Sequence, residues 1–533
     1  MTKNKIFFLV ILILAAFFRF WQLDELPLSP NWDEISHGYN AFSLLKTGRD
    51  QWGSAWPLFN FRAYGDYPTA LNLYLTLPFV ALLGLNTLSL RLPAAILGLV
   101  FTVVVYFLAR IFTKNRSLSL IAFAIAAFSP WTFFTSRAVF QSNPAQFFLS
   151  LGILLFLLSK NNNKNYQILS ALSLGLSLYS YHNSRIAAPL IFLSLLLIYR
   201  QFNKKNLLFI IVFLILAVPN LINLFSPESL VRNRWVGIIN PISVNIINER
   251  RRLFEGPVLL NLLANNKVTY FGSQFTSNLL NFLNPVPLFF TGSQNYQFNP
   301  PQTGLLYIFL LPFFYLGLIV SFKKVANNRH HLFLVVALLI SFIPAALTTG
   351  DFPSVRLTIA TPFIYLFITI GFSTIAAKTK GYLLPLFLIL TLTFFFNYWK
   401  NYQNYAQNYA SAWQYGHEET VNYLKSQYPQ YDQIVFTKKY GEPHQFILFY
   451  WPWDPASYHQ DPKLNTDFHS DWYWVNAFDK FVFVNDWEIK NYSFKPRTLL
   501  VTSPGNYPCL NSQLQKTINY PDLTPVFDIV SYD

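Results

Sequence analysis

Apolar residues recur along the chain in long runs that predict membrane-crossing helices. The first run, residues 6–21 (IFFLVILILAAFFRFW), follows the polar stretch Met-Thr-Lys-Asn-Lys. No small-x-small cleavage site follows it, so it predicts an uncleaved first span rather than a signal peptide. Several later runs are shorter than the roughly 20 residues of a full crossing, so their ends must extend into the flanks. These runs are 91–112, 117–135, 144–159, 166–181, 187–199, 207–224, 304–321, 332–348, 357–376 and 381–397.

Basic residues indicate which ends of these runs face the cytoplasm. With Lys3 and Lys5 inside, the positive-inside rule places the other clusters in every second loop. These clusters are Lys114/Arg116, Lys160/Lys164, Arg200/Lys204/Lys205, Lys323/Lys324/Arg329 and Lys378/Lys380. The apolar stretch 69–84 would break this alternation if it crossed, so we expect a juxtamembrane or re-entrant helix on the outer face. The sequence therefore predicts a multi-pass cell-membrane protein with about eleven spans and a cytoplasmic N-terminus.

Composition supports a membrane protein and excludes several other classes. The chain of 533 residues is 53% hydrophobic, 19% aromatic and 12% charged, with a mean hydropathy of +0.31. Because soluble domains carry about 25% charged residues, an ordinary soluble enzyme, a disordered chain and a nucleic-acid-binding domain are excluded. The net charge of +15 lies largely in the inner loops, where it sets topology. The single Cys509 excludes a disulfide framework.

Three segments are expected outside the membrane: the first loop 22–90, a middle loop of about 225–303, and the tail 398–533. The tail becomes polar and aromatic, and short strand-like runs (QIVFT, FVFVND, TLLVTS) alternate with helix-like stretches such as 416–426. We expect an α-helical polytopic membrane domain over residues 1–397, which includes the first loop. The tail is expected to form a small extracytoplasmic α/β domain.

Two adjacent carboxylates, Asp33 and Glu34, begin a predicted helix in the first loop (SPNWDEISHGYNAFSLLKTG). Asn31 can cap this helix with Glu34 at the third position of a capping box, and Gly48 can end it. This structural explanation covers both carboxylates. A carboxylate pair near the hydrocarbon boundary is equally a functional candidate, and the local pattern leaves both interpretations open. The apolar positions of the helix share one face: Ile35, Tyr39, Phe42 and Leu45.

A third carboxylate, Asp66, lies in RAYGDYPTALNLYL and precedes the apolar stretch 69–84. A turn after Gly65 accounts for it as well as a functional role does. Further motifs follow in a fixed order: RLPAA within GLNTLSLRLPAAILG, SPWTFFTSRAVFQSN, and LYSYHNSR. With the first span ending in FFRFWQL and the two acidic motifs, they resemble the membrane-embedded GT-C glycosyltransferases. The resemblance is to the bacterial relatives of protein O-mannosyltransferases and lipid A aminoarabinose transferases, over roughly residues 1–380.

This resemblance implies a transferase that takes a hexosyl or pentosyl unit from a polyprenyl-phosphate donor. The acceptor hydroxyl would lie at the outer membrane face, and transfer would invert the anomeric carbon. Asp33 matches the general base, Glu34 would position Asp33 or the acceptor or supply the cap, and Asp66 would shape the acceptor pocket. Relatives often have a Lys and two prolines after the second acid, whereas Tyr67, Pro68 and Thr69 follow here. An arginine is therefore expected to contact the donor phosphate.

Candidate phosphate ligands are the cations that break the positive-inside pattern, because topology does not require them on the outer face. Arginine suits this task through bidentate contact with phosphate oxygens. A structural or snorkelling role accounts for each of them equally well, and packing at the interface accounts for the histidine. The candidates are Arg62, Arg137, Arg185, Arg356 and His182.

Function beyond this class stays open in several respects. The acceptor could be a protein, a lipid or a glycan. The alternatives are a transporter or flippase of polyprenyl-linked glycans and a glycan polymerase. No metal site, cofactor or nucleic-acid partner is expected, and membrane lipids are the expected surroundings. The aromatic and acidic runs of the tail, FILFYWPWDPASYHQD and FHSDWYWVNAF, suit sugar rings, an interfacial aromatic belt or an ordinary core.

Overall fold

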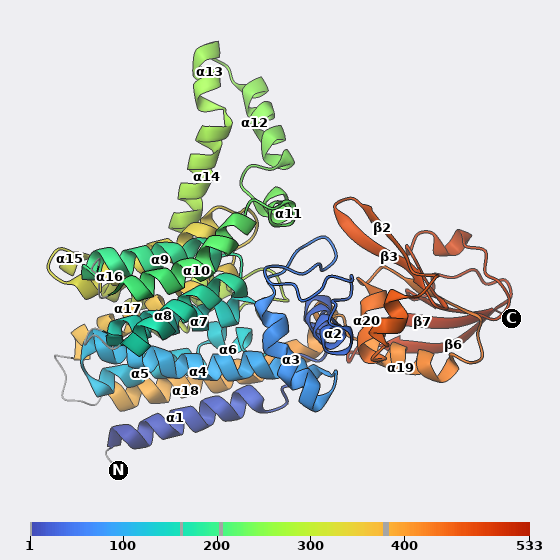
Figure 1. Ribbon diagram of the computed structural model, residues 1–533, viewed down its shortest axis with the longest axis horizontal. Coiled ribbons are helices and arrows are strands. Elements are labelled where there is room, and N and C mark those ends of the chain that lie inside the picture. Colours follow the sequence, from blue (N-terminus) through green and yellow to red (C-terminus); the bar gives the residue numbers. More distant parts are fainter. Residues whose placement is uncertain (1–2, 160–163, 202–205, 377–382, 533) are drawn as a thin grey trace. The chain divides into compact units, whose positions relative to one another are not determined.

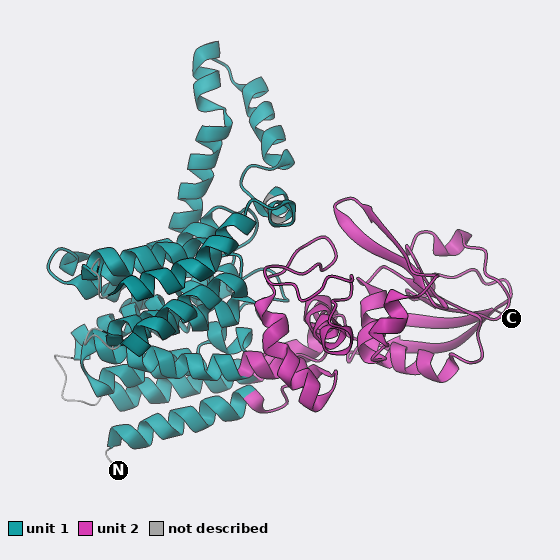
Figure 2. Cartoon of the chain, in the orientation of Figure 1, with its two compact units in different colours: residues 1–19, 96–136, 140–399 teal, residues 20–95, 137–139, 400–533 magenta. Residues whose placement is uncertain are grey.

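The computed structural model describes residues 3–159, 164–201, 206–376 and 383–532 (Figure 1). These residues form two compact units, which Figure 2 colours separately. We call residues 1–19, 96–136 and 140–399 the helical unit, and residues 20–95, 137–139 and 400–533 the loop–sheet unit. The predicted inner cations Lys160, Lys204, Lys205, Lys378 and Lys380 lie outside the described residues.

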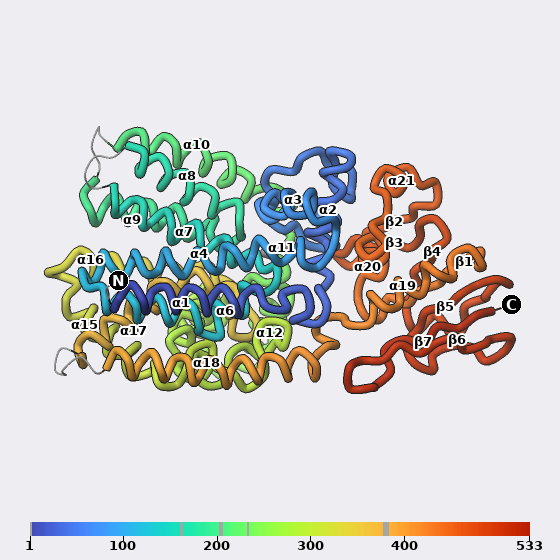
Figure 3. Tube along the Cα trace, turned by 90° about the horizontal axis from the view of Figure 1, so that it is seen from below, coloured from blue at the N-terminus to red at the C-terminus, as the bar shows by residue number. Residues whose placement is uncertain are grey.

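Each of the predicted apolar runs contains a helix, which confirms a polytopic helical membrane protein. Helix α1 lies beside α4, α5 and α18 (Figures 1 and 3), where Phe8 contacts Tyr106 and Phe123, and Phe18 contacts Phe395. The helices are α1 (Lys3–Phe20), α4 (Thr87–Thr113), α5 (Arg116–Phe128), α6 (Pro130–Thr135), α7 (Ser142–Leu158), α8 (Lys164–Ser180), α9 (Ser184–Tyr199), α10 (Leu207–Asn223), α15 (Leu311–Lys324), α16 (Arg329–Ala346), α17 (Thr361–Ala376) and α18 (Leu383–Asn408).

Four of the described helical stretches are long and apolar enough to cross a membrane: Thr87–Thr113, Arg329–Ala346, Arg356–Ala376 and Leu383–Asn408. Leu207–Asn223 and Pro227–Val236, bent by 67°, would make a fifth if they form one span. Helix α3 (Leu71–Leu83) has 13 residues, so it is about 20 Å long and does not cover a hydrocarbon core of about 30 Å. The expected non-crossing position of α3 stays a prediction, because α5, which lies in a predicted span, also has 13 residues. The count of about eleven spans stays a prediction.

Much of the middle loop forms an arm that projects from the helical bundle (Figure 1). Helix α13 in this arm has no buried residue, although it carries large aliphatic side chains such as Val258 and Leu259, which are 76% and 68% exposed. Exposed aliphatic surface of this kind is typical of lipid contact in a membrane protein. The helices are α11 (Pro227–Val236), α12 (Pro241–Leu253), α13 (Val258–Ala264) and α14 (Lys267–Asn281); three short helical turns, η3 (Pro287–Thr291), η4 (Ile308–Leu310) and η5 (Arg356–Ala360), complete the unit.

The loop–sheet unit contains a seven-stranded sheet with the order β2-β3-β4-β1-β5-β7-β6. The central strand β1 pairs in parallel with β4 and β5, and the outer pairs are antiparallel. The strands are β1 (Gln433–Thr437), β2 (Asn465–His469), β3 (Trp472–Phe478), β4 (Phe481–Val484), β5 (Thr498–Thr502), β6 (Ser512–Asn519) and β7 (Pro525–Tyr532). The helices are α2 (Trp32–Thr47), α3, η6 (Ala410–Trp413), α19 (His417–Gln427), α20 (Pro443–Tyr450), α21 (Pro455–His459) and η7 (Ile489–Asn491).

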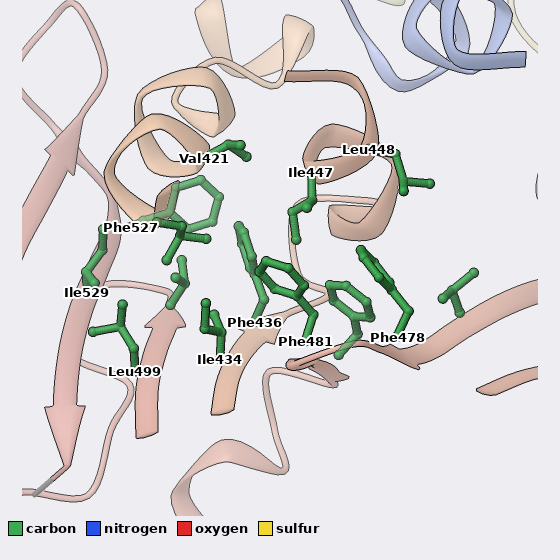
Figure 4. Close-up of a cluster of buried hydrophobic side chains, with 14 of the residues drawn as sticks. Val421, Ile434, Phe436, Ile447, Leu448, Phe478, Phe481, Leu499, Phe527 and Ile529 are labelled. Atoms are coloured by element: carbon green, nitrogen blue, oxygen red, sulfur yellow. The ribbon is translucent and has the colours of Figure 1, made fainter. Parts of the chain in front are cut away.

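The predicted α/β tail is confirmed, and its core explains why the first loop belongs to the same unit. Figure 4 shows Val421 of α19 and Ile447 of α20 above the strand residues Phe436 and Phe481. Tyr39 of α2 is fully buried in the same cluster. Because α2 contributes to this core, the compact units do not follow the expected division at residue 397.

Candidate active site

The predicted capping box at the start of α2 is confirmed. The Asn31 side chain accepts a hydrogen bond from the Glu34 backbone N–H at 3.0 Å, and Glu34 Oε2 accepts one from the Asn31 backbone N–H at 3.1 Å. At the other end, Gly48 has a φ of 70° and donates its N–H to the Leu44 carbonyl. The helix that carries the acidic pair is therefore fixed at both ends by the residues expected from sequence.

Glu34 is also half of a buried ion pair with Arg91, whose guanidinium Nε lies 3.1 Å from Glu34 Oε1. Oε1 accepts a further bond from the Val139 backbone N–H at 3.1 Å. The other guanidinium nitrogens of Arg91 donate to the carbonyls of Leu23, Pro27 and Ser29. Glu34 thus joins α2, α4 and the 137–139 segment, so the structure gives it a structural role in addition to the cap.

Asp33 differs from Glu34 because its side chain is exposed on the first turn of α2. Its backbone carbonyl accepts a hydrogen bond at 2.7 Å from Nδ1 of His37. Burial lowers the pKa of His37 to about 4, which keeps the imidazole neutral at physiological pH. The positive end of the helix dipole favours a carboxylate at position 33. Of the acidic pair, Asp33 is therefore the one presented at the surface of the unit.

Asp66 is half-buried and lies in a tight turn. A turn is one of the two interpretations that the sequence left open. Ala63 and Asp66 exchange backbone hydrogen bonds at 2.9 and 3.0 Å, and the Asp66 carboxylate accepts from the Tyr67 backbone N–H at 2.8 Å. Tyr64, inside this turn, has a φ of 55°. Burial raises the pKa of Tyr64, and the negative charges of Glu442 and Asp33 add to the effect. The Tyr64 hydroxyl donates to the Trp32 carbonyl at 2.8 Å, so the Asp66 turn lies against the first turn of α2.

Two of the predicted phosphate ligands belong to the loop–sheet unit and are engaged in structural contacts. Arg137 is fully buried, and its Nη2 donates to the carbonyls of Trp21, Gln22 and Leu26 at 2.9–3.1 Å. The Arg62 guanidinium lies over the ring of Tyr473, 4.2 Å from its centroid, and 5.5 Å from that of Trp52. These contacts order the first loop.

The other three candidates belong to the helical unit. The Asn183 side chain, in the turn between α8 and α9, donates to the Arg356 carbonyl at 2.7 Å. The Arg356 guanidinium donates to the Thr348 hydroxyl at 2.9 Å, and buried Arg185 lies 3.4 Å from the Ser229 hydroxyl. His182 is in the same turn as Asn183, half-buried. The structure thus places the turn between α8 and α9, which carries His182, against the backbone of Arg356.

Residues missed from the sequence include Arg91 and a group around Glu442. The sequence contained a signal for Arg91, because an arginine near the start of a long apolar helix calls for a compensating partner. Glu442 is 3% exposed, accepts a hydrogen bond from the Trp472 indole N–H, and lies 3.3 Å from His444 Nδ1. Within the described ranges, no three His, Cys, Asp or Glu side chains are placed to hold a metal ion.

Comparison with known proteins gives a family match for part of the chain and a fold match for nearly all of it. Residues 69–222 match the family model for dolichyl-phosphate-mannose-protein mannosyltransferase. No curated protein matches the chain. The structure of ArnT from Cupriavidus metallidurans bound to undecaprenyl phosphate is similar, with a TM-score of 0.56 and 11% identity, over 98% of this chain and 97% of that chain.

A second solved structure supports the same fold. The archaeal oligosaccharyltransferase AglB from Archaeoglobus fulgidus, in complex with an inhibitory peptide and a dolichol-phosphate, has a TM-score of 0.50 and 13% identity. The similarity covers 84% of this chain and 64% of that chain. The chain therefore has the GT-C fold of membrane glycosyltransferases, as its motifs predicted, and its residues 69–222 match the dolichyl-phosphate-mannose-protein mannosyltransferase family.

Proposed function

We propose that this protein is an inverting glycosyltransferase that moves a sugar from a polyprenyl-phosphate donor to an acceptor hydroxyl at the outer membrane face. The observation that carries the proposal is the division of roles between Asp33 and Glu34. Glu34 is buried against Arg91 and caps its own helix, whereas Asp33 is exposed on the same turn. A rigid capping box and ion pair would hold Asp33 in place, which is what a general base requires.

In the proposed reaction, the acceptor hydroxyl oxygen attacks the anomeric carbon on the face opposite the phosphate. The new C–O bond forms as the bond from the anomeric carbon to the phosphate oxygen breaks. The hydroxyl proton passes to the Asp33 carboxylate, and the bonding electron pair leaves with the polyprenyl phosphate. This balance needs one base and a compensating charge for the leaving phosphate, with no oxidant, reductant or metal.

Arg185, Arg356 and His182 are the proposed source of the compensating charge. Arginine stabilises a leaving phosphate as its negative charge grows, and its planar guanidinium can contact two oxygens at once. Arg137 and Arg62 are less suited, because one donates to three carbonyls and the other stacks on aromatic rings. Asp66, in its turn beside Tyr64, is proposed to shape the acceptor pocket.

Replacement of Asp33 by Asn tests the proposal. Purified protein is incubated with a panel of polyprenyl-phosphate sugars and envelope extracts, and released lipid and product are measured by mass spectrometry. General-base removal should lower the transfer rate by about 10²–10⁴-fold. Asp24→Asn is the matched control, since Asp24 is an exposed acid just after α1; it should keep wild-type activity. Undiminished transfer by the Asp33 variant would remove the base assignment, and movement of donor lipid without sugar transfer would favour a flippase.

A further inference from the structure

The loop–sheet unit contains a cavity of about 570 Å³ whose wall includes Trp32, the residue directly before Asp33. We propose that this cavity binds a saccharide unit of the acceptor, so that the acceptor is a glycan or glycolipid. This inference rests on the proposed transferase function. The volume falls within the roughly 300–1,000 Å³ typical of small-molecule sites. Residues that carry the argument are Trp32, Gln414, Lys438, Glu442, Trp472 and Trp474.

Aromatic rings form much of the cavity wall. The Trp472 ring lies 6.2 Å from that of Trp32 and 6.1 Å from that of Trp474, between ring centroids. Trp472 is also stacked on Tyr64, with the two rings 7° from parallel. This stacking fixes the orientation of Trp472. Rigid indoles offer the flat apolar surfaces against which the C–H faces of a pyranose ring pack, at little cost in side-chain entropy.

Polar groups of three kinds line the same cavity. Glu442 is a nearly buried carboxylate that accepts from the Trp472 indole. Since each carboxylate oxygen has two acceptor positions, Glu442 retains capacity for sugar hydroxyls. Lys438 supplies an ammonium group that is held by the Asn476 side chain at 2.6 Å and lies over the Trp474 ring. Gln414 supplies an amide. Such a mixture of donors and acceptors suits hydroxyl groups, which both donate and accept.

The charge balance of the cavity favours a neutral ligand over a phosphate. Glu442 and Lys438 bring opposite charges, and the second lysine in the wall, Lys439, lies 3.5 Å from Asp486. No arginine of the described part of the chain lines this cavity. Phosphate sites depend on unbalanced positive charge, usually with arginine, so the cavity is not suited to the donor phosphate.

Trp32 places the cavity next to the proposed base. The Cα atoms of Trp32 and Asp33 are about 3.8 Å apart, as for any consecutive residues. The Trp32 backbone N–H donates to Gln414 Oε1 at 2.8 Å, and Gln414 in turn donates to the Tyr440 carbonyl. Gly441 completes the contact, because a Cβ there would lie 2.5 Å from the Trp32 ring. A saccharide in the cavity would therefore lie beside the turn that carries Asp33.

Binding of saccharides by the full-length protein in detergent tests the proposal, with a printed glycan array as the probe. The wild type should retain a defined subset of glycans, whose affinity is then measured by fluorescence titration. Trp474→Ala and the near-isosteric Glu442→Gln should each weaken that affinity at least tenfold. Trp487→Ala is the matched control, since Trp487 belongs to the same unit, is 77% exposed and does not line the cavity; it should bind as the wild type does.

The same measurement separates this proposal from the proposed function. Asp33→Asn should retain the glycans, because Asp33 does not line the cavity. The cavity proposal is overturned if the wild type retains no glycan, or if both cavity variants bind as tightly as the wild type. If glycans bind as expected and Asp33→Asn still transfers sugar, the base assignment fails alone. If Asp33→Asn loses transfer and no glycan binds, the cavity proposal fails alone.

Discussion

Glu34 and Arg91 form a fully buried ion pair, 3.1 Å apart, that ties the first turn of α2 to the beginning of α4. The two residues are 57 positions apart in the sequence. Arg91 also donates to three carbonyls of the segment between α1 and α2, so a single side chain fixes the path of residues 23–29. The position of Asp33 depends on this arrangement.

Loss of either partner of this pair should strongly destabilise the protein. Glu34→Gln leaves the Arg91 charge buried without compensation, and Arg91→Met leaves Glu34 in the same state. Each should lower the free energy of unfolding by about 3–5 kcal/mol. Thermal and denaturant unfolding of the detergent-purified protein measures the effect.

The exposed pair of Lys439 and Asp486 provides the control for that measurement. Its lysine side chain is 45% exposed, so Lys439→Met should cost no more than about 1 kcal/mol. Equal effects at the buried and the exposed pair would contradict the structural role assigned to Arg91.

Arg137 is expected to act on stability rather than on donor binding. Arg137→Lys replaces the planar guanidinium by a compact ammonium, which cannot reproduce the geometry of the three carbonyl contacts. Loss of charge-assisted hydrogen bonds should cost about 1.5–3 kcal/mol. The KM for the polyprenyl-phosphate donor should stay near its wild-type value. Arg356→Gln is the comparison, and it should raise that KM. A raised donor KM in Arg137→Lys with an unchanged unfolding midpoint would show that Arg137 contributes to binding of the donor phosphate.

The helices were predictable from sequence because each one lies in a run of apolar residues, which is a local feature of the sequence. The cap of α2 was predictable for the same reason, since Asn31, Glu34 and Gly48 act within one helix. In the tail, the apolar runs at β1, β4 and β5 predicted strands. Four strands were missed: β2, β3, β6 and β7. For β2 and β6 the reason is that their sequences NTDFH and SQLQKTIN are mainly polar and their side chains are largely exposed.

The candidate site was less predictable because its contacts join distant segments. The local pattern left a structural and a functional interpretation open for both Asp33 and Glu34, and the buried ion pair with Arg91 gives Glu34 a structural role that no local pattern indicates. Arg137 was selected because it breaks the charge pattern, but the carbonyls that it contacts are more than 110 residues away. Trp32 and Glu442 meet in one cavity through folding of the first loop onto the sheet, which no spacing in the sequence indicates.

The expected orientation can be measured with the native cysteine. Cys509 is the single cysteine of the chain and is exposed. If the loop–sheet unit lies outside the membrane, a membrane-impermeant maleimide should label Cys509 in intact spheroplasts. In a Cys509→Ser background, Lys324→Cys should react only after permeabilisation, since Lys324 is in a predicted inner loop. If Lys324→Cys were labelled in intact spheroplasts and Cys509 were not, the predicted topology would be wrong.

Gly441 is expected to tolerate no side chain. Its φ of 119° is unfavourable for other residues, and a Cβ would approach both the Trp32 ring and the Gln414 amide. Gly441→Ala should therefore displace the loop before α20 and weaken saccharide binding in the cavity. Gly505→Ala is the control, because it also has a positive φ, of 68°, but a Cβ there meets no atom within 4 Å. Equal glycan affinities for both variants would show that the close packing of Gly441 against Trp32 does not contribute to saccharide binding.

Protein stability should fall in mild acid because of buried histidines in the loop–sheet unit. Burial lowers the pKa of His417 from 6.5 to about 4. His417 is stacked on Phe446, with 3.8 Å between ring centroids, and its Nδ1–H donates to the Gln414 carbonyl. Between pH 6.5 and 4 the unfolded chain binds a proton that the folded chain does not. Stability is therefore complete above pH 6.5 and is lost as the pH falls through this window, by at most about 1.4 kcal/mol per pH unit for each such group.

His37 titrates in the same direction, since burial also lowers its pKa to about 4. Unfolding midpoints of the purified protein, measured from pH 7.5 to 4.5, should decrease below pH 6.5. His417→Gln keeps a hydrogen-bond donor but has no titratable group, so it should reduce the slope by about half. A slope that His417→Gln does not alter would show that folding leaves the pKa of His417 unshifted.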